Sequence, residues 1–383
     1  MIEPTEEPIS GWLARERLEI RQVLYKVGNT AVYRAYSQEL SRPVALKLLL
    51  CMNTNEVAMR EAENQEILEH SNVVRIYRYV RLPKDERSWV LCLEEELMDS
   101  DLSNEIKRRN KSVKPWKEEE IGKFVVDMVE VLALAQAMGI AHRDIKPQNV
   151  LLTGTTFKLA DFGWSRRLRE EDRFTSLSGT PNYLSPALHE AYLMYQKQVL
   201  HNPYKSDVFS LGLTVLNMVR LVERPELNSS TGILSAVLSS LKCADWLQAL
   251  LALMLETVES LRPDFIVLAD LLRACSSRGS ACTHSPSCSR FQACSSCLRP
   301  TQFIGLCSRY LRSGGQLTGT PAGMETCSAC SKVLVEGDLV PLEAPAGIYC
   351  TGCLQTKLDE EEVTQRCRSS LFSLIYYSML NAL

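Results

Sequence analysis

Short runs of strand-forming residues, with apolar and polar positions closely interleaved, dominate the first hundred residues of the chain. The runs with this pattern are residues 32–36, 44–48, 73–80 and 89–93. A Ser-Arg-Pro turn at 41–43 separates the first two and makes them antiparallel. Residues 55–70 instead are rich in charged helix formers with a sparse apolar stripe. We therefore predict a strand-rich unit that contains one helix.

Beyond residue 101 the apolar positions recur at helical spacing. The clearest pattern runs from Ile121 to Ala135, and Gly139 follows it as a C-terminal stop. Similar patterns at 207–221 and 246–258 predict further helices. A helical unit is therefore expected to follow the strand-rich one.

Near residue 274 the composition changes again. Serine, glycine, proline and cysteine dominate residues 274–323, as in a linker or a small metal-held module. The last segment, 361–383, is apolar enough to form one short helix, which packs on its own chain or docks on a partner. Self-packing is the favoured interpretation.

Composition and charge exclude several classes of protein. The 383 residues are 45% hydrophobic and 23% charged, which is ordinary globular composition. Lys and Arg total 43 against 46 Asp and Glu, a net charge of -3, so no overall basic field favours nucleic acid or an anionic membrane. The acidic start MIEPTEEPIS lacks the features of a secretory signal, and no apolar run approaches the roughly 20 residues of a membrane span. We expect a cytoplasmic protein, with the nucleus left open.

The cysteines are distributed unevenly. Of 14 cysteines, ten lie between Cys275 and Cys353. In a reducing compartment such a cluster indicates metal before disulfides. Two CxxC pairs have the spacing of a structural four-thiolate zinc site, which we favour over free thiols, and their members are Cys327, Cys330, Cys350 and Cys353.

A second cysteine group is incomplete. Cys294, Cys297 and Cys307 have the arrangement of three zinc ligands, but the expected fourth position is Tyr310. The residues that could complete such a knuckle are Cys282, His284 and Cys288. No ligand set is assigned there.

The strongest chemical signal is HRDIKPQN at 142–149, followed by KLADFG at 158–163. At this spacing the two strings resemble the catalytic loop and the metal-binding segment of eukaryotic protein kinases. The resemblance implies that Asp144 is the catalytic base, that Lys146 lies near the transferred phosphate, and that Asn149 and Asp161 hold Mg²⁺. A lysine two residues after the aspartate resembles the serine/threonine-specific branch.

Other segments extend the resemblance into the strand-rich unit. Lys47 in VALK resembles the lysine that binds the α and β phosphates, with Glu61 as its helix partner in preference to Glu63. The stretch WVLCLEEELMDSDL at 89–102 resembles the hinge that binds adenine. Six residues complete the implied nucleotide site. They are Glu96 and Met98 through their backbone, Glu95 at the gatekeeper position, and Gly28, Val32 and Ala45 as further contacts.

The sequence departs from the family in two places. Residues 25–32 read YKVGNTAV, so only Gly28 remains of the glycines that cover the phosphates, and we predict a substituted or shortened turn. The family's Ala-Pro-Glu element reads Ser-Pro-Ala, with Ala187 in place of the glutamate that pairs with an arginine, here Arg262. Glu190 is either its substitute or a surface residue.

The activation segment, 164–186, completes the resemblance. Residues 175–178 lie where activating phosphorylation falls, and Arg143 is placed to pair with such a phosphate. Thr180 is expected near Asp144 and Lys146. Asp207 resembles the aspartate that braces the catalytic loop, with a helix N-cap as the alternative or additional role.

These resemblances imply an α+β bilobal kinase fold: a small antiparallel β lobe with one helix at about 18–97 and a mainly helical lobe at about 98–273. Residues 1–17 form an N-terminal extension, 274–323 the Cys/Ser-rich segment, 324–360 the four-Cys zinc module and 361–383 the apolar helix. The expected function is a serine/threonine kinase that uses ATP and Mg²⁺ on protein substrates, with Zn²⁺ in a module that binds a protein partner. A pseudokinase scaffold is the alternative.

Overall fold

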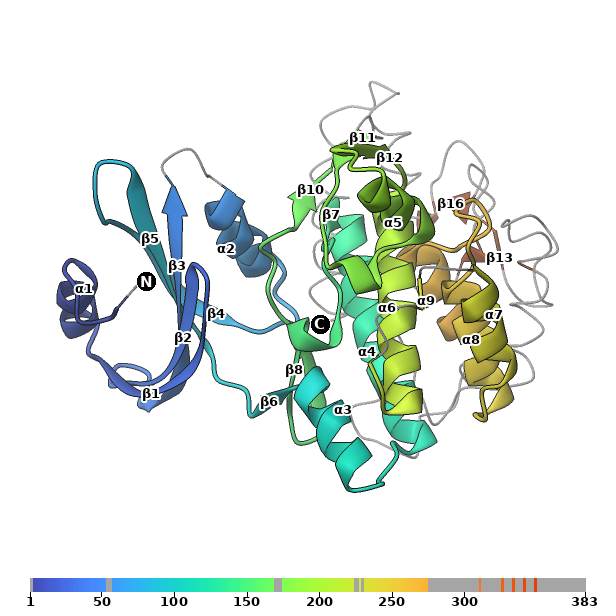
Figure 1. Ribbon diagram of the computed structural model, residues 1–383, viewed down its shortest axis with the longest axis horizontal. Helices are drawn as coiled ribbons and strands as arrows, with labels where there is room; N and C mark the ends of the chain where they lie inside the picture. Colours follow the sequence, from blue (N-terminus) through green and yellow to red (C-terminus); the bar gives the residue numbers. More distant parts are fainter. Residues whose placement is uncertain are drawn as a thin grey trace.

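The computed structural model describes residues 3–52, 57–168, 174–223, 227–228 and 231–274, with short pieces at 310, 325–326, 333–334, 340–341 and 348–349. A strand-rich lobe and a helical lobe lie side by side, joined by the chain after β5 (Ser88–Glu96) (Figure 1). The expected α+β kinase architecture is confirmed for this part of the chain.

The small lobe contains one five-stranded antiparallel sheet with the order β1-β2-β3-β5-β4. Its other strands are β1 (Leu18–Val27), β2 (Thr30–Ser37), β3 (Arg42–Met52) and β4 (Ile76–Pro83). The turn at Ser41, which has φ +52°, connects β2 to β3 as the Ser-Arg-Pro pattern predicted. Alternation along β3 sends Val44, Leu46 and Leu48 to one face of the sheet and Lys47 to the other.

A helix that the sequence analysis did not anticipate covers the first of these faces. Helix α1 (Ile9–Arg15) buries Ile9, Trp12 and Leu13 in the same apolar cluster as Val44 and Leu46. These three side chains recur at i, i+3 and i+4, which is helical spacing, but seven residues are too few for a confident periodic signal. The extension therefore completes the core of the small lobe.

The second face of the sheet carries α2 (Val57–Ile67), the helix predicted from residues 55–70. Its small side chains Ala58 and Ala62 pack on Trp89, Leu91 and Leu93 of β5. Because alanines allow close approach, α2 sits directly on the face of the sheet that carries Lys47.

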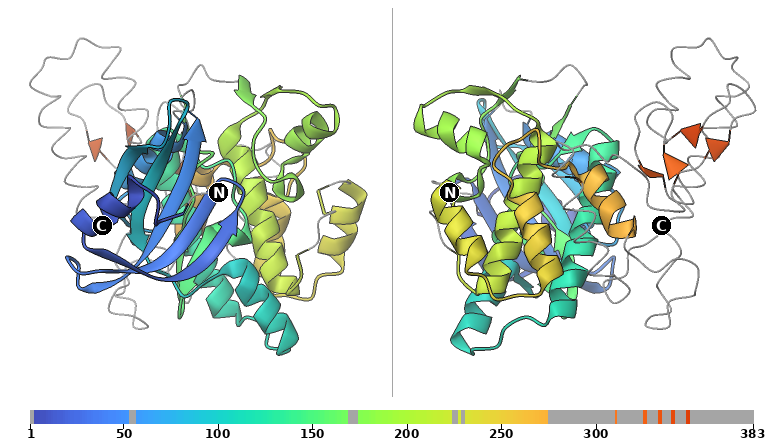
Figure 2. Two further views of the ribbon diagram at one scale, coloured as in Figure 1. Left: turned by 60° about the vertical axis from the view of Figure 1, so that its left-hand side comes forward. Right: turned by 90° about the vertical axis from the view of Figure 1, so that its right-hand side faces the viewer.

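The large lobe is mainly helical (Figure 2). Its apolar core includes the buried side chains of α4 and α6. Its helices are α3 (Leu102–Lys111), α4 (Glu118–Ala137), α5 (Pro186–Leu193), α6 (Pro203–Arg220), α7 (Thr231–Ser239), α8 (Asp245–Met254) and α9 (Phe265–Ala274). Helix α4 ends two residues before Gly139, which adopts φ +76° as the predicted stop requires. None of the described helices is both long and apolar enough to cross a bilayer.

Short strands and turns shape the catalytic segments of the large lobe. They are β6 (Ser100–Asp101), β7 (Ile140–Ala141), η1 (Pro147–Asn149), β8 (Val150–Thr153), β9 (Thr156–Leu159), β10 (Arg166–Arg167), β11 (Phe174–Ser176), η2 (Pro181–Tyr183) and β12 (Gln198–Leu200). Strand β10 pairs with β7, and β11 pairs with β12. The activation segment is therefore held by antiparallel pairing near its start and in its middle.

The described pieces near the C-terminus form two small antiparallel pairs. Strand β13 (Glu325–Thr326) pairs with β14 (Val333–Leu334), β15 (Val340–Pro341) pairs with β16 (Ile348–Tyr349), and β13 contacts β16. Tyr310 is buried in the core of the large lobe. The nine cysteines and the histidine named for metal binding, the other cysteines of this region, and the predicted helix at 361–383 lie outside the described residues.

Candidate active site

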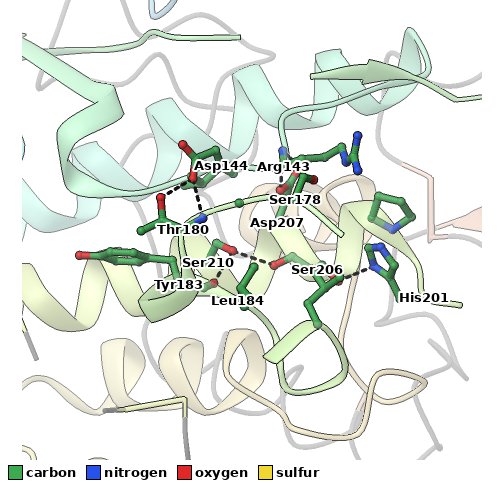
Figure 3. A pocket seen from close by; sticks show the side chains of 14 residues that line it. Arg143, Asp144, Ser178, Thr180, Tyr183, Leu184, His201, Ser206, Asp207 and Ser210 are labelled. Atoms are coloured by element: carbon green, nitrogen blue, oxygen red, sulfur yellow. Dashed lines mark hydrogen bonds between the residues drawn. The ribbon is translucent and has the colours of Figure 1, made fainter. Parts of the chain in front are cut away.

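Asp144 lies at the centre of the site, in the loop between β7 and β8, and is 4% exposed. Lys146 Nζ donates to its Oδ2 atom at 2.6 Å, and Asn149 Nδ2 to the same atom at 3.2 Å. The backbone N–H and the hydroxyl of Thr180 both donate to Oδ1, at 2.9 and 2.7 Å (Figure 3). These donors hold the carboxylate in one orientation. Thr180 thus lies beside Asp144 and Lys146, where the resemblance placed it.

Gly179 allows Thr180 to reach Asp144. The glycine adopts φ +105°, and a Cβ atom there would lie 2.7 Å from the carbonyl oxygen of Arg143. Only glycine fits both the conformation and the space. The Gly-Thr-Pro element is therefore required by the close approach of two backbones.

Asp207, on α6, fixes the backbone of the catalytic loop. Its carboxylate accepts hydrogen bonds from the N–H groups of His142 at 2.8 Å and Arg143 at 2.9 Å. Burial raises the pKa of Asp207 to about 7, although these amide bonds oppose the shift. The N-cap of α6 is Asn202, whose Oδ1 accepts from the N–H of Lys205 at 3.1 Å. Asp207 is therefore not the N-cap of α6. Its two hydrogen bonds match the other expected role, that of bracing the catalytic loop.

The residues expected to hold nucleotide and Mg²⁺ bridge the two lobes. Lys47 Nζ on β3 lies 2.9 Å from Oδ1 of Asp161, and the Asp161 side chain is 41% exposed. Asn149 is buried, and its Nδ2 also donates to the carbonyl of Asp144 at 2.8 Å. Val32 lies opposite Lys47 in the β2–β3 register. Asp161 adopts φ +61°, an unusual conformation for a non-glycine residue that is typical of functional sites.

This donor set fits Mg²⁺ bound together with a nucleotide. Mg²⁺ prefers oxygen ligands and uses one or two protein groups plus phosphates. Asp161 and Asn149 offer a carboxylate and an amide oxygen, and Lys47 offers a cation for phosphate oxygens. Over the described residues, no group of three or more His, Cys, Asp or Glu side chains could form an all-protein metal cage.

The predicted departure in the phosphate-covering turn takes the shortened form. Strands β1 and β2 stay paired as far as Val27 and Thr30, which leaves a two-residue turn of Gly28 and Asn29. Gly28 adopts φ +56°, as such a tight turn requires. The N–H of Leu50 donates to the carbonyl of Asn29 at 2.8 Å, so the turn is fastened to β3.

The helix partner of Lys47 stays a prediction. Glu61 belongs to α2, which lies on the correct face of the sheet, but its side chain is outside the described part. Glu63 is exposed. One hydrogen bond between α2 and the activation segment was not predicted from the sequence: Asn64 Nδ2 donates to the Ser165 hydroxyl at 2.9 Å. Ser165 is buried and therefore belongs to the packing of this segment.

The hinge begins where β5 ends. The N–H of Glu96 donates to the carbonyl of Arg75 at 2.8 Å, so a bond from this residue to adenine must use its carbonyl oxygen. Met98 follows in the extended connection to β6. Glu95 pairs in register with Ala45, on the sheet face that carries Lys47. Burial raises the pKa of Glu95, while the nearby Lys47 opposes this shift.

Comparison with known families agrees with this geometry. The family model described as protein kinase domain matches residues 25–276. The chain belongs to the protein kinase family.

Similar kinases include the serine/threonine-protein kinase PLK4 of Xenopus tropicalis, 28% identical over 57% of this chain and 22% of the relative. Aurora kinase A-B of Xenopus laevis is 29% identical over 60% of this chain and 53% of its own length. The Aurora kinase of Schizosaccharomyces pombe is 30% identical over 59% and 63%. The chain thus spans between 22% and 63% of these relatives. The first of these relatives is named a serine/threonine-protein kinase, which agrees with the expected class.

In this kinase the hydroxyls of the activation segment differ in accessibility. Ser176 is exposed, and its hydroxyl accepts from a guanidinium nitrogen of Arg143 at 3.0 Å. Thr175 and Ser178 are buried. Phosphorylation in this segment stays a prediction, and the geometry makes Ser176 the candidate that Arg143 already contacts.

A buried chain of polar side chains holds the activation segment of the kinase on α6. His201 Nδ1 lies 2.8 Å from Ser206 Oγ (Figure 3). Thr175 Oγ1 lies 2.7 Å from His201 Nε2, and Ser206 Oγ lies 3.0 Å from Ser185 Oγ. His201 was not predicted from the sequence, because a single histidine outside any motif gives no recognisable signal. Burial, aided by the nearby Arg143, lowers the pKa of His201 to about 4.

Acidification should therefore destabilise the kinase through His201. The unfolded chain, with an ordinary histidine pKa of 6.5, takes up this proton more readily than the folded chain. Stability should fall as the pH drops from 7 to 5, by about 2 kcal/mol from this group. His201→Gln does not titrate, so its loss of stability in urea unfolding over that range should be smaller by that amount. Equal losses in both proteins would contradict this assignment.

Arg262 is the arginine that the family pairs with a glutamate, and Ala187 stands in place of that glutamate. The arginine is 1% exposed and donates to the backbone carbonyls of Glu256 at 2.7 Å and Lys205 at 3.0 Å. Its guanidinium lies 4.9 Å from the ring centre of Phe209. Glu190 is exposed, so it is the surface residue of the two alternatives. Backbone carbonyls and an aromatic face take the place of the expected carboxylate.

Proposed function

We propose that this chain is an active serine/threonine kinase that transfers the γ-phosphate of ATP to protein hydroxyls. The observation that carries the proposal is the fixed Asp144 carboxylate, held by Thr180, Lys146 and Asn149. Lys47 and Asp161 meet beside it across the two lobes.

Each of these residues has its own role in phosphoryl transfer. Asp144 orients the substrate hydroxyl and accepts its proton, and Lys146 lies beside this carboxylate to meet the charge of the transferred group. Lys47 would bind phosphate oxygens of ATP, and Asn149 and Asp161 would hold Mg²⁺. ATP with Mg²⁺ supplies the phosphoryl group and the neutralising charge when bound. Gly28, Val32, Ala45 and the backbone of Glu96 and Met98 would enclose the nucleotide.

The alternative, a pseudokinase scaffold, is not favoured. Glu95, Ala187 and the short Gly28 turn support it, since each departs from the family. However, Arg262 binds backbone carbonyls in place of the missing glutamate. The side chains expected for catalysis are present in two contacting groups, Asp144 with Lys146 and Asn149, and Lys47 with Asp161. A scaffold has no chemical need for that set.

The direct test is transfer from labelled ATP by the purified full chain. We expect incorporation into protein serine or threonine that requires Mg²⁺ and stops when EDTA removes it. Phosphoamino acid analysis identifies the acceptor. A folded chain that transfers no phosphate to any of a broad panel of proteins and peptides would support the scaffold.

We also propose a structural zinc site in the C-terminal region. Cys327 and Cys330 occur in the connection between β13 and β14, and Cys350 directly follows β16, with Cys353 beyond it. Because β13 contacts β16, the two CxxC pairs start from neighbouring strands. Two short strand pairs bury little apolar surface, so a metal would supply the folding energy that they lack. The module would bind a protein partner of this cytoplasmic kinase.

Metal analysis of the full chain tests the zinc site. We expect Cys327→Ser with Cys350→Ser to lose about one Zn²⁺ per chain relative to the unchanged protein, under reducing conditions. Cys243→Ser is the matched control, since Cys243 lies in the kinase domain. Equal zinc content in all three proteins would refute the assignment.

A further inference from the structure

The loop between α3 and α4 projects an apolar side chain into solvent. Val113 is 85% exposed, and its backbone has φ +49°. In this left-handed conformation a β-branched side chain crowds its own backbone, whereas glycine adopts the conformation freely. The protein therefore keeps a strained, apolar residue at a position where its side chain buries almost nothing.

The strain at Val113 arises from the way α3 ends. The N–H of Val113 donates to the carbonyl of Asn110 at 3.1 Å, and the N–H of Lys114 donates to the carbonyl of Arg109 at 3.0 Å. This pair of bonds is the Schellman motif, in which the left-handed residue is usually glycine. The helix end therefore gives no reason for a valine side chain. A strained residue of this kind indicates a function.

Basic side chains surround the valine. Between Ile106 and Lys117 the chain has six basic residues and no acidic one. We call residues 107–117 the basic apex. The chain as a whole has a net charge of -3, so positive charge is concentrated here locally. The four lysines of the basic apex are all exposed: Lys107, Lys111, Lys114 and Lys117.

Contacts with the large lobe fix the shape of the basic apex from behind. The guanidinium of Arg109 lies 3.6 Å from the ring centre of Trp116 and pairs with Glu120 at 3.0 Å. Trp116 is buried. Glu118, the first acidic residue after the lysines, accepts a hydrogen bond from the indole N–H of Trp246 on α8. The protein thus uses Arg109 internally and presents the lysines to solvent.

The form of the basic apex fits an anionic membrane surface. Helix α3 and the loop that follows it form an outer end of the large lobe (Figure 1, Figure 2). Lysines bind anionic headgroups, and an apolar side chain among them can enter the boundary between headgroups and acyl chains. An acidic protein segment would use the lysines but not a lone valine on a projecting end. Single-stranded nucleic acid stacks on exposed aromatic rings, and Trp116 is buried.

We propose that the basic apex binds anionic phospholipid at a membrane surface, with Val113 in the headgroup region and the four lysines on the headgroups. The contact is peripheral and reversible, and salt weakens it because ions screen the exposed lysines. It does not depend on phosphoryl transfer by the catalytic loop. It gives the kinase a means of concentrating beside proteins at such a surface.

Co-sedimentation of the full-length kinase with vesicles tests the proposal. The vesicles contain phosphatidylcholine with about one-third phosphatidylserine, or phosphatidylcholine alone. We expect binding to the first kind only, and release as the salt concentration rises. Lys111→Gln with Lys114→Gln should weaken binding by about 25-fold, about fivefold for each lysine. The matched control is Arg87→Gln with Lys197→Gln, which removes two exposed charges elsewhere and should bind as the unchanged protein does.

A glycine substitution separates the proposed role of Val113 from a structural one. Val113→Gly relieves the strained backbone, so the melting temperature should rise by about 1–4 °C. The same change removes the apolar side chain, so binding to phosphatidylserine vesicles should weaken by about 3–10-fold. Val113→Leu keeps an apolar side chain and should still bind. Phosphoryl transfer to a soluble protein substrate, without vesicles, should be the same in all these variants.

The result that would overturn the inference is undiminished binding to phosphatidylserine vesicles by either the double lysine variant or Val113→Gly. A kinase that binds an acidic peptide or an RNA through these lysines but binds no vesicle would also overturn it, because the partner would belong to another class. A chain that transfers no phosphate, but loses vesicle binding with the two lysines and with Val113, supports this inference while the kinase proposal fails.

Discussion

Replacing Asp144 with asparagine is expected to lower the rate of phosphoryl transfer by about 10²–10⁴-fold, the usual contribution of a general base. The amide has the same shape, and its oxygen can still accept both hydrogen bonds from Thr180. It cannot accept the proton of the substrate hydroxyl. The rate should be measured with saturating ATP and Mg²⁺, and the melting temperature should be compared with that of the unchanged kinase.

A second aspartate serves as the control for this loss. Asp85 lies in the turn between β4 and β5, where it accepts only local hydrogen bonds. Asp85→Asn should retain full activity. Should Asp144→Asn transfer phosphate as fast as Asp85→Asn, the transfer does not depend on this loop.

Replacing Arg262 with alanine is expected to reduce the free energy of unfolding by about 3–5 kcal/mol. The change removes the donor for the backbone carbonyls of Glu256, Lys205 and Thr257. It also opens a cavity beside Phe209, and the loss should be large because the Arg262 side chain is almost completely buried. Urea unfolding at constant pH measures it.

The control for Arg262 is an arginine on the surface. The Arg108 side chain is 63% exposed and pairs with Glu105 one helical turn away. Arg108→Ala should cost far less than Arg262→Ala, because solvent screens an exposed ion pair. If the two variants unfold at the same urea concentration, the guanidinium of Arg262 is not the link that holds α6 to the loop before α9.

Much of the fold was predictable because its signals are local. The strands around residues 32–36 and 44–48 and the helix that ends before Gly139 appear where their patterns placed them. The loss of neighbouring glycines predicted a substituted or shortened turn at Gly28, and the structure shows the shortened form. Helix α1 was not predicted, since its three buried side chains acquire meaning only against the sheet that they cover.

The part of the site that neighbouring residues of the chain form was predictable from the sequence. The spacing of Asp144, Lys146 and Asn149 places all three on one short loop, where Lys146 and Asn149 both donate to the Asp144 carboxylate. Their roles toward ATP and Mg²⁺ stay predictions. The correction to Asp207 shows the limit of this reasoning. A position near a helix start suggested a cap, but the first turn of α6 is capped by Asn202, and Asp207 turns toward a loop 65 residues earlier.

The sequence by itself determined the chemistry: which carboxylates, amides and cations are present, and which of them share a loop. The tertiary structure alone decided which distant groups meet. Lys47 reaches Asp161 across 114 positions, and Ser103 reaches Glu223 across 120. Such meetings depend on how sheet and helices pack, and packing results from the sum of many weak apolar contacts that no short motif records.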